Sequence, residues 1–337
     1  MTVNPAPGRG ARQRSALRLA GDIGGTKALL ALFDGPCARF ERCYACREFA
    51  SFRVLLERFL ADAGTALGQA PHIERASFGV AGPVVGSHAR LTNLPWQIDA
   101  AELGLPKVRL LNDFEAAAHA LDALAAADLA TLQPGAPLEG APRLLIGAGT
   151  GLGVAFVLGR GRGLRVVPGE GGHAAFAPAD DLQEALWRHL RASLGRVELE
   201  HVISGRGLAR IYAFLGSTGR YVESAATRTA IAAGDAPAAI AHAALAAGDA
   251  LASAALDLFV ACYGAATGDY ALAVLPRAGV YVTGGIAPRI LSRLRAGGFV
   301  AAFNAKGAFA GAARDCPVHV VTNARLGLLG AAAAASA

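Results

Sequence analysis

An aspartate stands between an apolar run and a pair of glycines near the start of the chain. In "GDIGGTK", Asp22 follows residues 17–20, which are apolar apart from one arginine, and precedes Gly24 and Gly25. An unpaired carboxylate at the end of a buried strand is costly unless a cation meets it. Hydrated Mg²⁺, which one carboxylate and the substrate's phosphates can hold together, is a suitable partner. We therefore expect Asp22 to bind Mg²⁺ through water.

An amide and an acid follow a second apolar run. Asn112 and Asp113 come directly after residues 108–111 in "VRLLNDF". Open α/β sheets place their ligands at the carboxyl ends of strands. An acid there can accept a proton from a substrate hydroxyl, which is typically worth ~10²- to 10⁴-fold in rate. The alternative is that the acid only caps the following helix.

A carboxylate and an imidazole flank two further glycines. In "VPGEGGHAAFAP", Glu170 and His173 surround Gly171 and Gly172. This turn is a poor core element, but its acceptors and donors suit vicinal hydroxyls. Together with the preceding amide and acid, the pair predicts a sugar site.

Two glycine-rich turns repeat each other across the halves of the chain. Residues 17–33 read as strand, "GDIGGTK" and strand, and residues 143–158 do the same around "GAGTGLG". A dinucleotide fingerprint or P-loop would lead from strand into helix. Glycines at a hairpin tip permit positive φ and let backbone N–H groups approach an anion; alternatively, they only make tight hairpins. We expect the tips to bind a polyphosphate through Gly24, Gly25, Thr26, Gly149, Thr150 and Gly151.

The elements that position these residues alternate between strands and helices. Helices are expected after the caps Ser51 and Asp99, and the second half is mostly helical. The alanine-rich ending "GAAAAASA" is expected to be a fraying helix end. The expected strands are residues 17–20, 28–33, 76–80, 108–111, 143–146, 154–158, 164–167, 279–282 and 318–321. This order predicts an α/β chain in two lobes.

Length and composition favour a protein of two domains with no membrane span. The 337 residues exceed the size of most single cores. The most apolar stretch, residues 251–275, contains Asp257 and Asp269, which a membrane span would resist. Residues 1–17 lack an apolar core of signal-peptide length and are expected to form a disordered tail.

Charge and cysteine content favour a cytoplasmic protein that does not bind nucleic acid. The net charge is +6, but the arginines beyond the tail are scattered. Five cysteines, an odd number, suit a reducing compartment. Cys43 and Cys46 form a C-x-x-C, which is either a redox pair, half of a zinc site or two thiols at the end of a strand.

Six motifs together resemble the bacterial glucokinase family of ATP-dependent sugar kinases. They are "GDIGGTK", "LLNDFEAAA", "GAGTGLGVA", "PGEGGHAAFAP", "LEHVISGRGL" and "VTGGIAPR", and they cover nearly everything from Leu19 to about Gly330. The resemblance implies two RNase-H-like, actin-like ATPase lobes with a cleft between them. The implied domains are residues 18–112, completed by a C-terminal helix over 323–337, and residues 113–322.

The resemblance also implies a role for each site residue. Asp113 would be the general base on the sugar's 6-hydroxyl, and Asn112, Glu170, His173 and Glu200 would bind the sugar. Gly284 and Gly285 end a strand before a helix that Pro288 would start, a placement suited to the adenosine side of the nucleotide. "GTK" departs from the "GTN" of many members, which puts a role for Lys27 in doubt.

These observations predict a cytoplasmic glucokinase that uses MgATP to make glucose 6-phosphate. By family likeness we expect a homodimer. Related repressor-type sugar kinases carry a zinc-binding cysteine cluster after the Gly-Gly-His region. This chain has no cysteine between Cys46 and Cys262, so no structural zinc is expected. The alternatives are a kinase for another hexose or amino sugar, and a catalytically silent sugar-sensing regulator. The choice between ATP and polyphosphate as donor stays open.

Overall fold

The computed structural model describes residues 16–246 and 248–336, without the side chain of Arg162, and the chain divides into two compact units. The first comprises Met1–Ala120 and Arg325–Ala337, and the second comprises Leu121–Ala324. Residues 113–120, which the sequence-based division assigns to the second domain, belong to the first unit. The expected tail lies outside the described residues as far as residue 15, and Leu17 already begins the first strand.

A mixed five-stranded sheet forms the centre of the first unit. Its strand order is β3-β2-β1-β4-β8, in which β1, β4 and β8 are parallel and the β1–β2 and β2–β3 pairs are antiparallel. The strands are β1 (Leu17–Ile23), β2 (Lys27–Asp34), β3 (Cys37–Ala45), β4 (Ile73–Val80) and β8 (Val108–Asn112).

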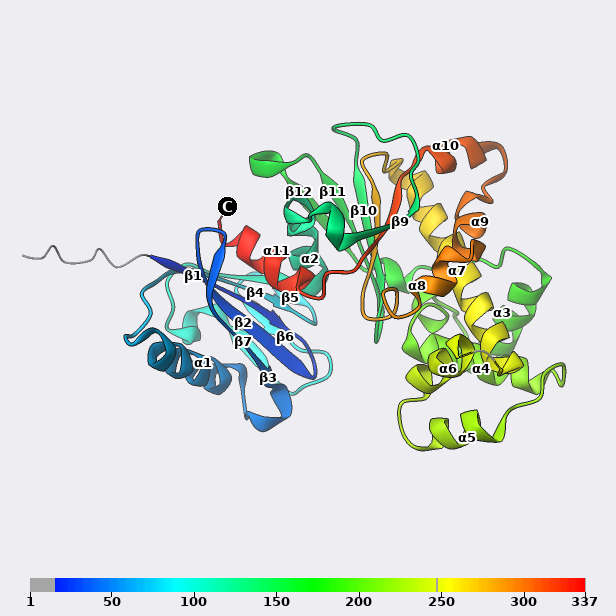
Figure 1. The fold of residues 1–337 in the computed structure, drawn as a ribbon, viewed down its shortest axis with the longest axis horizontal. Coiled ribbons are helices and arrows are strands. Elements are labelled where there is room, and N and C mark those ends of the chain that lie inside the picture. Colours follow the sequence, from blue (N-terminus) through cyan, green and yellow to red (C-terminus); the bar gives the residue numbers. More distant parts are fainter. Residues whose placement is uncertain (1–15, 247, 337) are drawn as a thin grey trace, which may run out of the picture. The chain divides into compact units, whose positions relative to one another are not determined.

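Helices cover both faces of this sheet (Figure 1). On one face, α1 (Phe52–Leu67) starts at the predicted cap Ser51, whose side chain accepts the Val54 N–H, and it buries Phe52, Leu55 and Phe59. On the other face, α2 (Asp113–His119) and α11 (Leu326–Ala334) pack together against β4 and β1.

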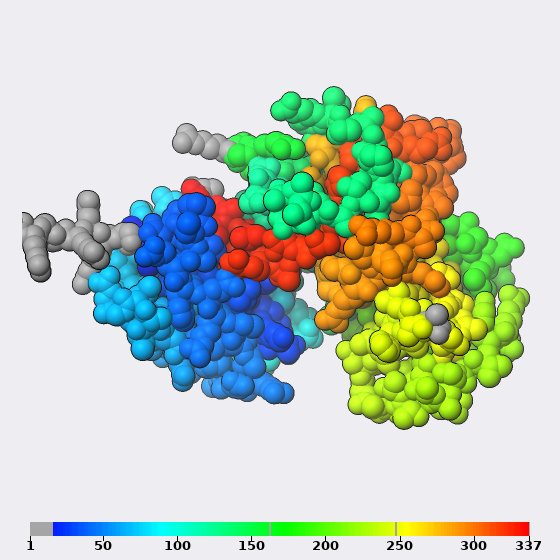
Figure 2. All heavy atoms as spheres, in the orientation of Figure 1, coloured from blue at the N-terminus to red at the C-terminus, as the bar shows by residue number. Residues whose placement is uncertain are grey.

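The C-terminal helix belongs to the core of the first unit. Leu328, Ala331 and Ala332 of α11 pack in one cluster with Ala20 and Ala31 of the first hairpin. Figure 2 shows the red atoms of this segment beside the blue atoms of the N-terminal strands. The expectation of a fraying end is therefore wrong, because burial of small side chains holds the helix in place.

A small antiparallel sheet completes the first unit. It contains β5 (Val84–Val85), β6 (His88–Arg90) and β7 (Gln97–Asp99). Asp99 caps a short 3₁₀ helix, Ala100–Leu103, rather than an α-helix.

The second unit contains a six-stranded sheet in the order β12-β11-β10-β13-β14-β9. The strands are β9 (Leu129–Gln133), β10 (Arg143–Ala148), β11 (Leu152–Leu158), β12 (Arg165–Gly169), β13 (Val280–Thr283) and β14 (Val318–Val321). Strand β9 is antiparallel to β14 and adds one strand beyond the pattern of the first unit.

The two sheets repeat one topology. In the first unit β1 is antiparallel to β2 and parallel to β4, and in the second β10 is antiparallel to β11 and parallel to β13. The next strand, β8 or β14, is again parallel to its neighbour. The internal repeat seen in the sequence is thus a repeat of whole sheets, each with a glycine-rich hairpin at its centre.

The second unit contains α-helices, several of which pack against one long apolar helix. They are α3 (Asp181–Leu194), α4 (Gly205–Ser217), α5 (Ala225–Ala232), α6 (Ala236–Leu245), α7 (Ala250–Val274), α8 (Leu291–Arg295), α9 (Gly298–Asn304) and α10 (Ala310–Asp315). The long helix is α7, and α4, α6, α8, α9 and α10 pack against it. Among the described residues, α7 is the helix with the length and apolar composition to cross a membrane, but it is mostly buried in this unit. Long apolar helices of this kind also form the cores of globular proteins.

Candidate active site

Close approach, rather than positive φ, explains the glycines of the first hairpin. The Gly24 N–H donates to the Lys27 carbonyl at 2.9 Å. A Cβ built at Gly25 would lie 3.0 Å from the Cβ of Asn93, and neither glycine has positive φ. These two glycines therefore do not use the positive φ that glycine permits. Thr26 and Lys27 are exposed beside it.

Asp22 lies one residue before the end of β1 and faces the start of α11. A Cβ built at Gly327 would lie 2.5 Å from Asp22 Oδ2. Burial, and then the negative charge of nearby Asp113, raise the pKa of Asp22 from 3.8 to about 6. The carboxylate is therefore short of compensating positive charge, which is what a cation site requires.

The cap of α2 is Asn112, and Asp113 Oδ1 also accepts the Phe114 N–H at 2.9 Å. Asn112 Oδ1 accepts the Phe114 N–H at 2.9 Å, and its amide nitrogen donates to the Gly82 carbonyl at 3.2 Å. These bonds fix the side chain that ends β8. Asp113 is the first residue of the helix and is partly exposed.

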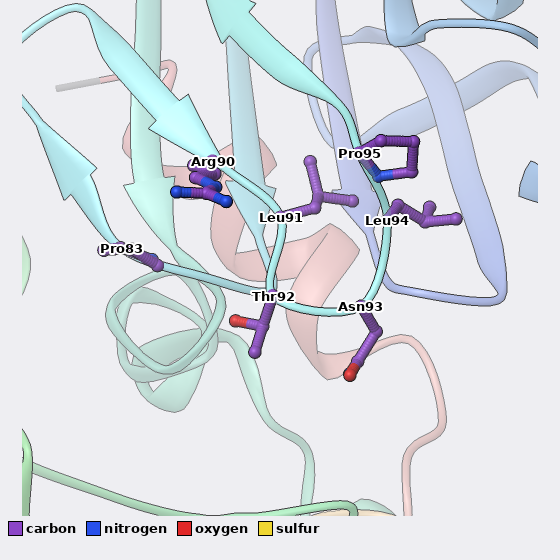
Figure 3. A pocket seen from close by; sticks show the side chains of 7 residues that line it. All are labelled: Pro83, Arg90, Leu91, Thr92, Asn93, Leu94 and Pro95. Carbon is purple, nitrogen blue, oxygen red and sulfur yellow. The ribbon is translucent and has the colours of Figure 1, made fainter.

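A pocket of about 610 Å³ borders this region of the first unit. It is formed by the loop around β6, and Thr92 and Asn93 lie at its turn with their side chains pointing away from the loop backbone (Figure 3). Asn93 connects the loop to the hairpin through Gly25, and Gly82 connects it to Asn112. This loop could not be predicted from the sequence, because its polar residues are no different from those of any surface turn. Its lining residues are Pro83, Arg90, Leu91, Thr92, Asn93, Leu94 and Pro95.

The second hairpin tip, residues 149–151, is enclosed by two other segments. The Gly205 N–H at the start of α4 donates to the Gly149 carbonyl at 2.9 Å. Gly284, with φ of 85°, follows β13, and a Cβ there would lie 2.3 Å from the Ala148 carbonyl oxygen. Thr150 and Gly285 are exposed at this edge. The five predicted nucleotide-binding residues of the second unit therefore lie together.

Pro288 does not start a helix. Turns occupy residues 284–290, and α8 begins at Leu291 and is only five residues long. The expected helix N-terminus at this position is therefore absent. Gly284 and Gly285 lie in a turn beside the second hairpin tip instead.

Glu200 binds the second hairpin. Its Oε2 accepts the Leu152 N–H at 3.0 Å and lies 2.4 Å from a Cβ built at Gly151. The other oxygen, Oε1, is 3.8 Å from the Arg206 guanidinium. The hydrogen bond between Leu152 and Glu200 joins residues 48 positions apart, so it could not be predicted from the sequence pattern.

The turn that carries Glu170 and His173 packs on the same hairpin. A Cβ at Gly172 would lie 2.1 Å from the Leu152 carbonyl oxygen, and one at Gly171 would lie 2.8 Å from Tyr270 Oη. Neither glycine has positive φ, so close packing again explains them. Glu170 and His173 are both exposed.

Glu198 orients His173 and was not identified from the sequence. Its Oε2 is 2.8 Å from His173 Nδ1, and this hydrogen bond raises the pKa of His173. The same bond lowers the pKa of Glu198. A second unpredicted residue is Tyr270 of α7, whose hydroxyl donates to the Gly171 carbonyl at 2.6 Å. Both act on groups far away in sequence.

The cysteines do not gather into a metal site in the described part of the chain. All five are free, Cys43 is exposed and Cys46 is buried in the core cluster beneath α1. Cys46 Sγ lies 3.4 Å from the Gly24 carbonyl oxygen. Residues 16–246 and 248–336 contain no group of three or more histidine, cysteine or acidic side chains placed to hold a metal.

Comparison with known sequences gives one consistent result. A family model described as glucokinase matches residues 19–337. A glucokinase from Synechocystis sp. is 39% identical over 94% of this chain and 97% of its own length. A glucokinase from Trichormus variabilis is 38% identical over 95% of this chain and 99% of its own length.

Solved structures agree with the sequence comparison. A glucokinase from an Antarctic psychrotroph has a TM-score of 0.80 at 30% identity and covers 95% of this chain and 98% of its own. A ROK-family glucokinase from Streptomyces griseus, solved with glucose and AMPPNP, has a TM-score of 0.62 at 22% identity. The match covers 95% of this chain and 99% of that protein's chain. The second likeness concerns the fold alone. The α/β, actin-like ATPase fold predicted from the sequence is confirmed.

Proposed function

Because the chain belongs to the glucokinase family, as its six motifs indicated, we propose that it transfers the γ-phosphoryl group of ATP to the 6-hydroxyl of glucose. The observation that carries this proposal is the position of Leu152 in the second unit. Its N–H donates to Glu200 and its carbonyl accommodates Gly172. Leu152 therefore connects the second hairpin, which suits phosphates, to the turn of residues 170–173, which suits sugar hydroxyls.

Asp113 is the proposed general base. It accepts the proton of the 6-hydroxyl while the hydroxyl oxygen attacks the γ-phosphorus and ADP leaves. It is the first residue of α2, where Asn112 caps the helix and Asp113 Oδ1 also accepts the Phe114 N–H at 2.9 Å. Proton acceptance by such a group contributes ~10²- to 10⁴-fold in rate.

Asn112, Glu170, His173 and Glu200 are the proposed sugar ligands. Each offers a carbonyl, carboxylate or ring nitrogen that suits a hydroxyl. The hydrogen bond that His173 Nδ1 donates to Glu198 fixes the imidazole ring, so the nitrogen that remains, Nε2, can face the sugar. A site of this kind rejects an analogue that lacks one hydroxyl, because its own polar groups then go unpaired.

The proposed phosphate ligands are the backbone N–H groups and threonines of the two hairpin tips, with Gly284 and Gly285 beside the second. Mg²⁺ bound with ATP would neutralise charge on the phosphates during transfer. The residues fit a hydrated ion rather than a protein cage. Asp22 supplies a single carboxylate whose raised pKa reflects a lack of nearby positive charge. Mg²⁺ is usually held by one or two carboxylates together with the substrate's phosphates.

The test compares wild type with Asp113→Asn, using enzyme-coupled detection of glucose 6-phosphate and calorimetry of glucose binding. We expect kcat to fall at least ~10²-fold while glucose still binds. Asp181→Asn, an exposed aspartate on α3, is the matched control and should retain wild-type activity. An inactive wild type that still binds glucose would support the sensor alternative instead.

A panel of donors and acceptors addresses the remaining alternatives. We propose glucose over mannose, glucosamine and N-acetylated sugars, and ATP over polyphosphate. A higher kcat/KM for another sugar than for glucose would make that sugar the substrate, and a higher kcat/KM for polyphosphate than for ATP would make polyphosphate the donor. We further propose that the protein is cytoplasmic and forms a homodimer. Light scattering of the purified protein measures its molar mass in solution and so tests the dimer.

A further inference from the structure

Arg206 is a cation in an unusual place. It is in the first turn of α4, a 13-residue helix, and its side chain is 67% exposed. The N-terminal end of a helix carries partial positive charge, so a cation there is unfavourable by itself. Its charged neighbour is Glu200, at 3.8 Å between the guanidinium nitrogen and Oε1.

The start of α4 is fixed to the second hairpin tip. The Gly205 N–H donates to the Gly149 carbonyl at 2.9 Å. The Ser204 hydroxyl, which caps the helix, donates to the Glu200 carbonyl at 2.7 Å. The backbone of Arg206 is therefore held beside residues 149–151, where the phosphates of the donor are proposed to bind.

The pair with Glu200 is weak and leaves the guanidinium free to change partners. Its 3.8 Å separation is near the upper limit for an ion pair, and Glu200 Oε2 already accepts the Leu152 N–H. Exposed ion pairs of this kind contribute little. A phosphate offers the guanidinium two parallel charge-assisted hydrogen bonds and is the stronger partner.

We propose that Arg206 binds the terminal phosphates of the nucleotide and releases Glu200 when it does so. Glu200 Oε1 is then free to accept a hydrogen bond from a sugar hydroxyl. The exchange couples donor binding to sugar binding through one pair of side chains, and such coupling acts equally in both directions. The inference rests on the proposed function, because it concerns the same site.

The test uses the full-length protein and three variants. Calorimetry measures binding of AMPPNP with Mg²⁺, and of glucose with and without AMPPNP. In Arg206→Gln we expect AMPPNP to bind about 10- to 100-fold more weakly, as loss of charge-assisted hydrogen bonds implies. We also expect AMPPNP to tighten glucose binding in wild type and to leave it unchanged in the variant. Arg206→Lys, which keeps charge without the planar fork, should give intermediate affinity.

Arg188→Gln is the matched control. Arg188 is 71% exposed on α3 and pairs with Glu184, so it reproduces the loss of an exposed helical ion pair away from the site. Its binding constants should equal those of wild type. Thermal melting checks that each variant is folded.

Two results would overturn the inference. One is AMPPNP affinity in Arg206→Gln within twofold of Arg188→Gln. The other is a loss of glucose affinity without nucleotide, which would assign Arg206 to the sugar alone. Failure of the proposed function is a separate result, since wild type would then form no glucose 6-phosphate from glucose and MgATP.

Discussion

The Asp22 carboxylate occupies the space that a side chain at Gly327 would fill, at 2.5 Å from the ideal Cβ to Oδ2. The first helical turn of α11 therefore lies directly against the proposed cation ligand. Gly327→Ala should displace Asp22 and lower kcat/KM for MgATP by up to about 10²-fold, since a shift of about 1 Å in a positioned group can cost that much. Steady-state kinetics at varied MgATP measures the effect.

Gly311→Ala is the control for that substitution. It also places alanine in a helix, α10, but a Cβ there meets nothing within 4 Å. Its kinetics should match wild type. Equal kinetics in both variants would show that Asp22 tolerates displacement.

The pKa of Asp22 predicts a stability change with pH. Its folded pKa of about 6 exceeds the unfolded value of 3.8, so its favourable contribution is complete below pH 3.8 and is lost as pH rises through 6. The loss amounts to about 3 kcal/mol at most. Asp22→Asn should therefore raise the free energy of unfolding near pH 7 relative to wild type, with less difference at pH 4. Urea unfolding without Mg²⁺ or nucleotide at both values measures this, and parallel pH curves would contradict it.

Glu198 controls the protonation of His173. Its hydrogen bond raises the pKa of His173 above 6.5, so the ring's contribution to stability is present below 6.5 and is lost as pH rises through the raised value. Glu198→Gln should lower the NMR titration midpoint of His173 and weaken glucose binding. Glu184→Gln, on α3, should leave the midpoint unchanged. A midpoint that stays high in Glu198→Gln would assign the shift to another group.

Gly151 leaves room for Glu200. A Cβ at this position would lie 2.4 Å from Oε2, so Gly151→Ala should break the Leu152–Glu200 hydrogen bond. We expect weaker binding of both AMPPNP and glucose, by about tenfold or more for each lost charged hydrogen bond. Gly163→Ala has open space around its Cβ and serves as the control. Unchanged glucose affinity in Gly151→Ala would contradict the role of Glu200 in the sugar site.

Local patterns predicted the central strands and both hairpins. Short glycine-rich turns between two strand-like apolar runs are typical of hairpins, so β1–β2 and β10–β11 could be predicted from the sequence. Ser51 predicted the start of α1 in the same way, through its cap. These features depend on residues within a few positions of one another.

Strand β3 and several close contacts did not follow from local patterns. Strand β3 is at the edge of its sheet and exposes most of its side chains, so it has no clear apolar alternation. Gly151, Gly172 and Gly327 are required because each lies against a residue that is remote in sequence, where a Cβ would clash. The partners Glu198 and Tyr270 were missed for the same reason, since an acid and a tyrosine have many uses.

The position of α11 has a consequence for synthesis of the chain. The helix that supports Asp22 is Leu326–Ala334, whereas the hairpin it packs against is made first. At roughly 5–20 residues per second, the ribosome needs many seconds to make the residues between them. During that time the apolar face of β1 and β2 that α11 will cover has no partner. The second unit is therefore synthesised before the helix that supports Asp22, and a chain released early would lack that support.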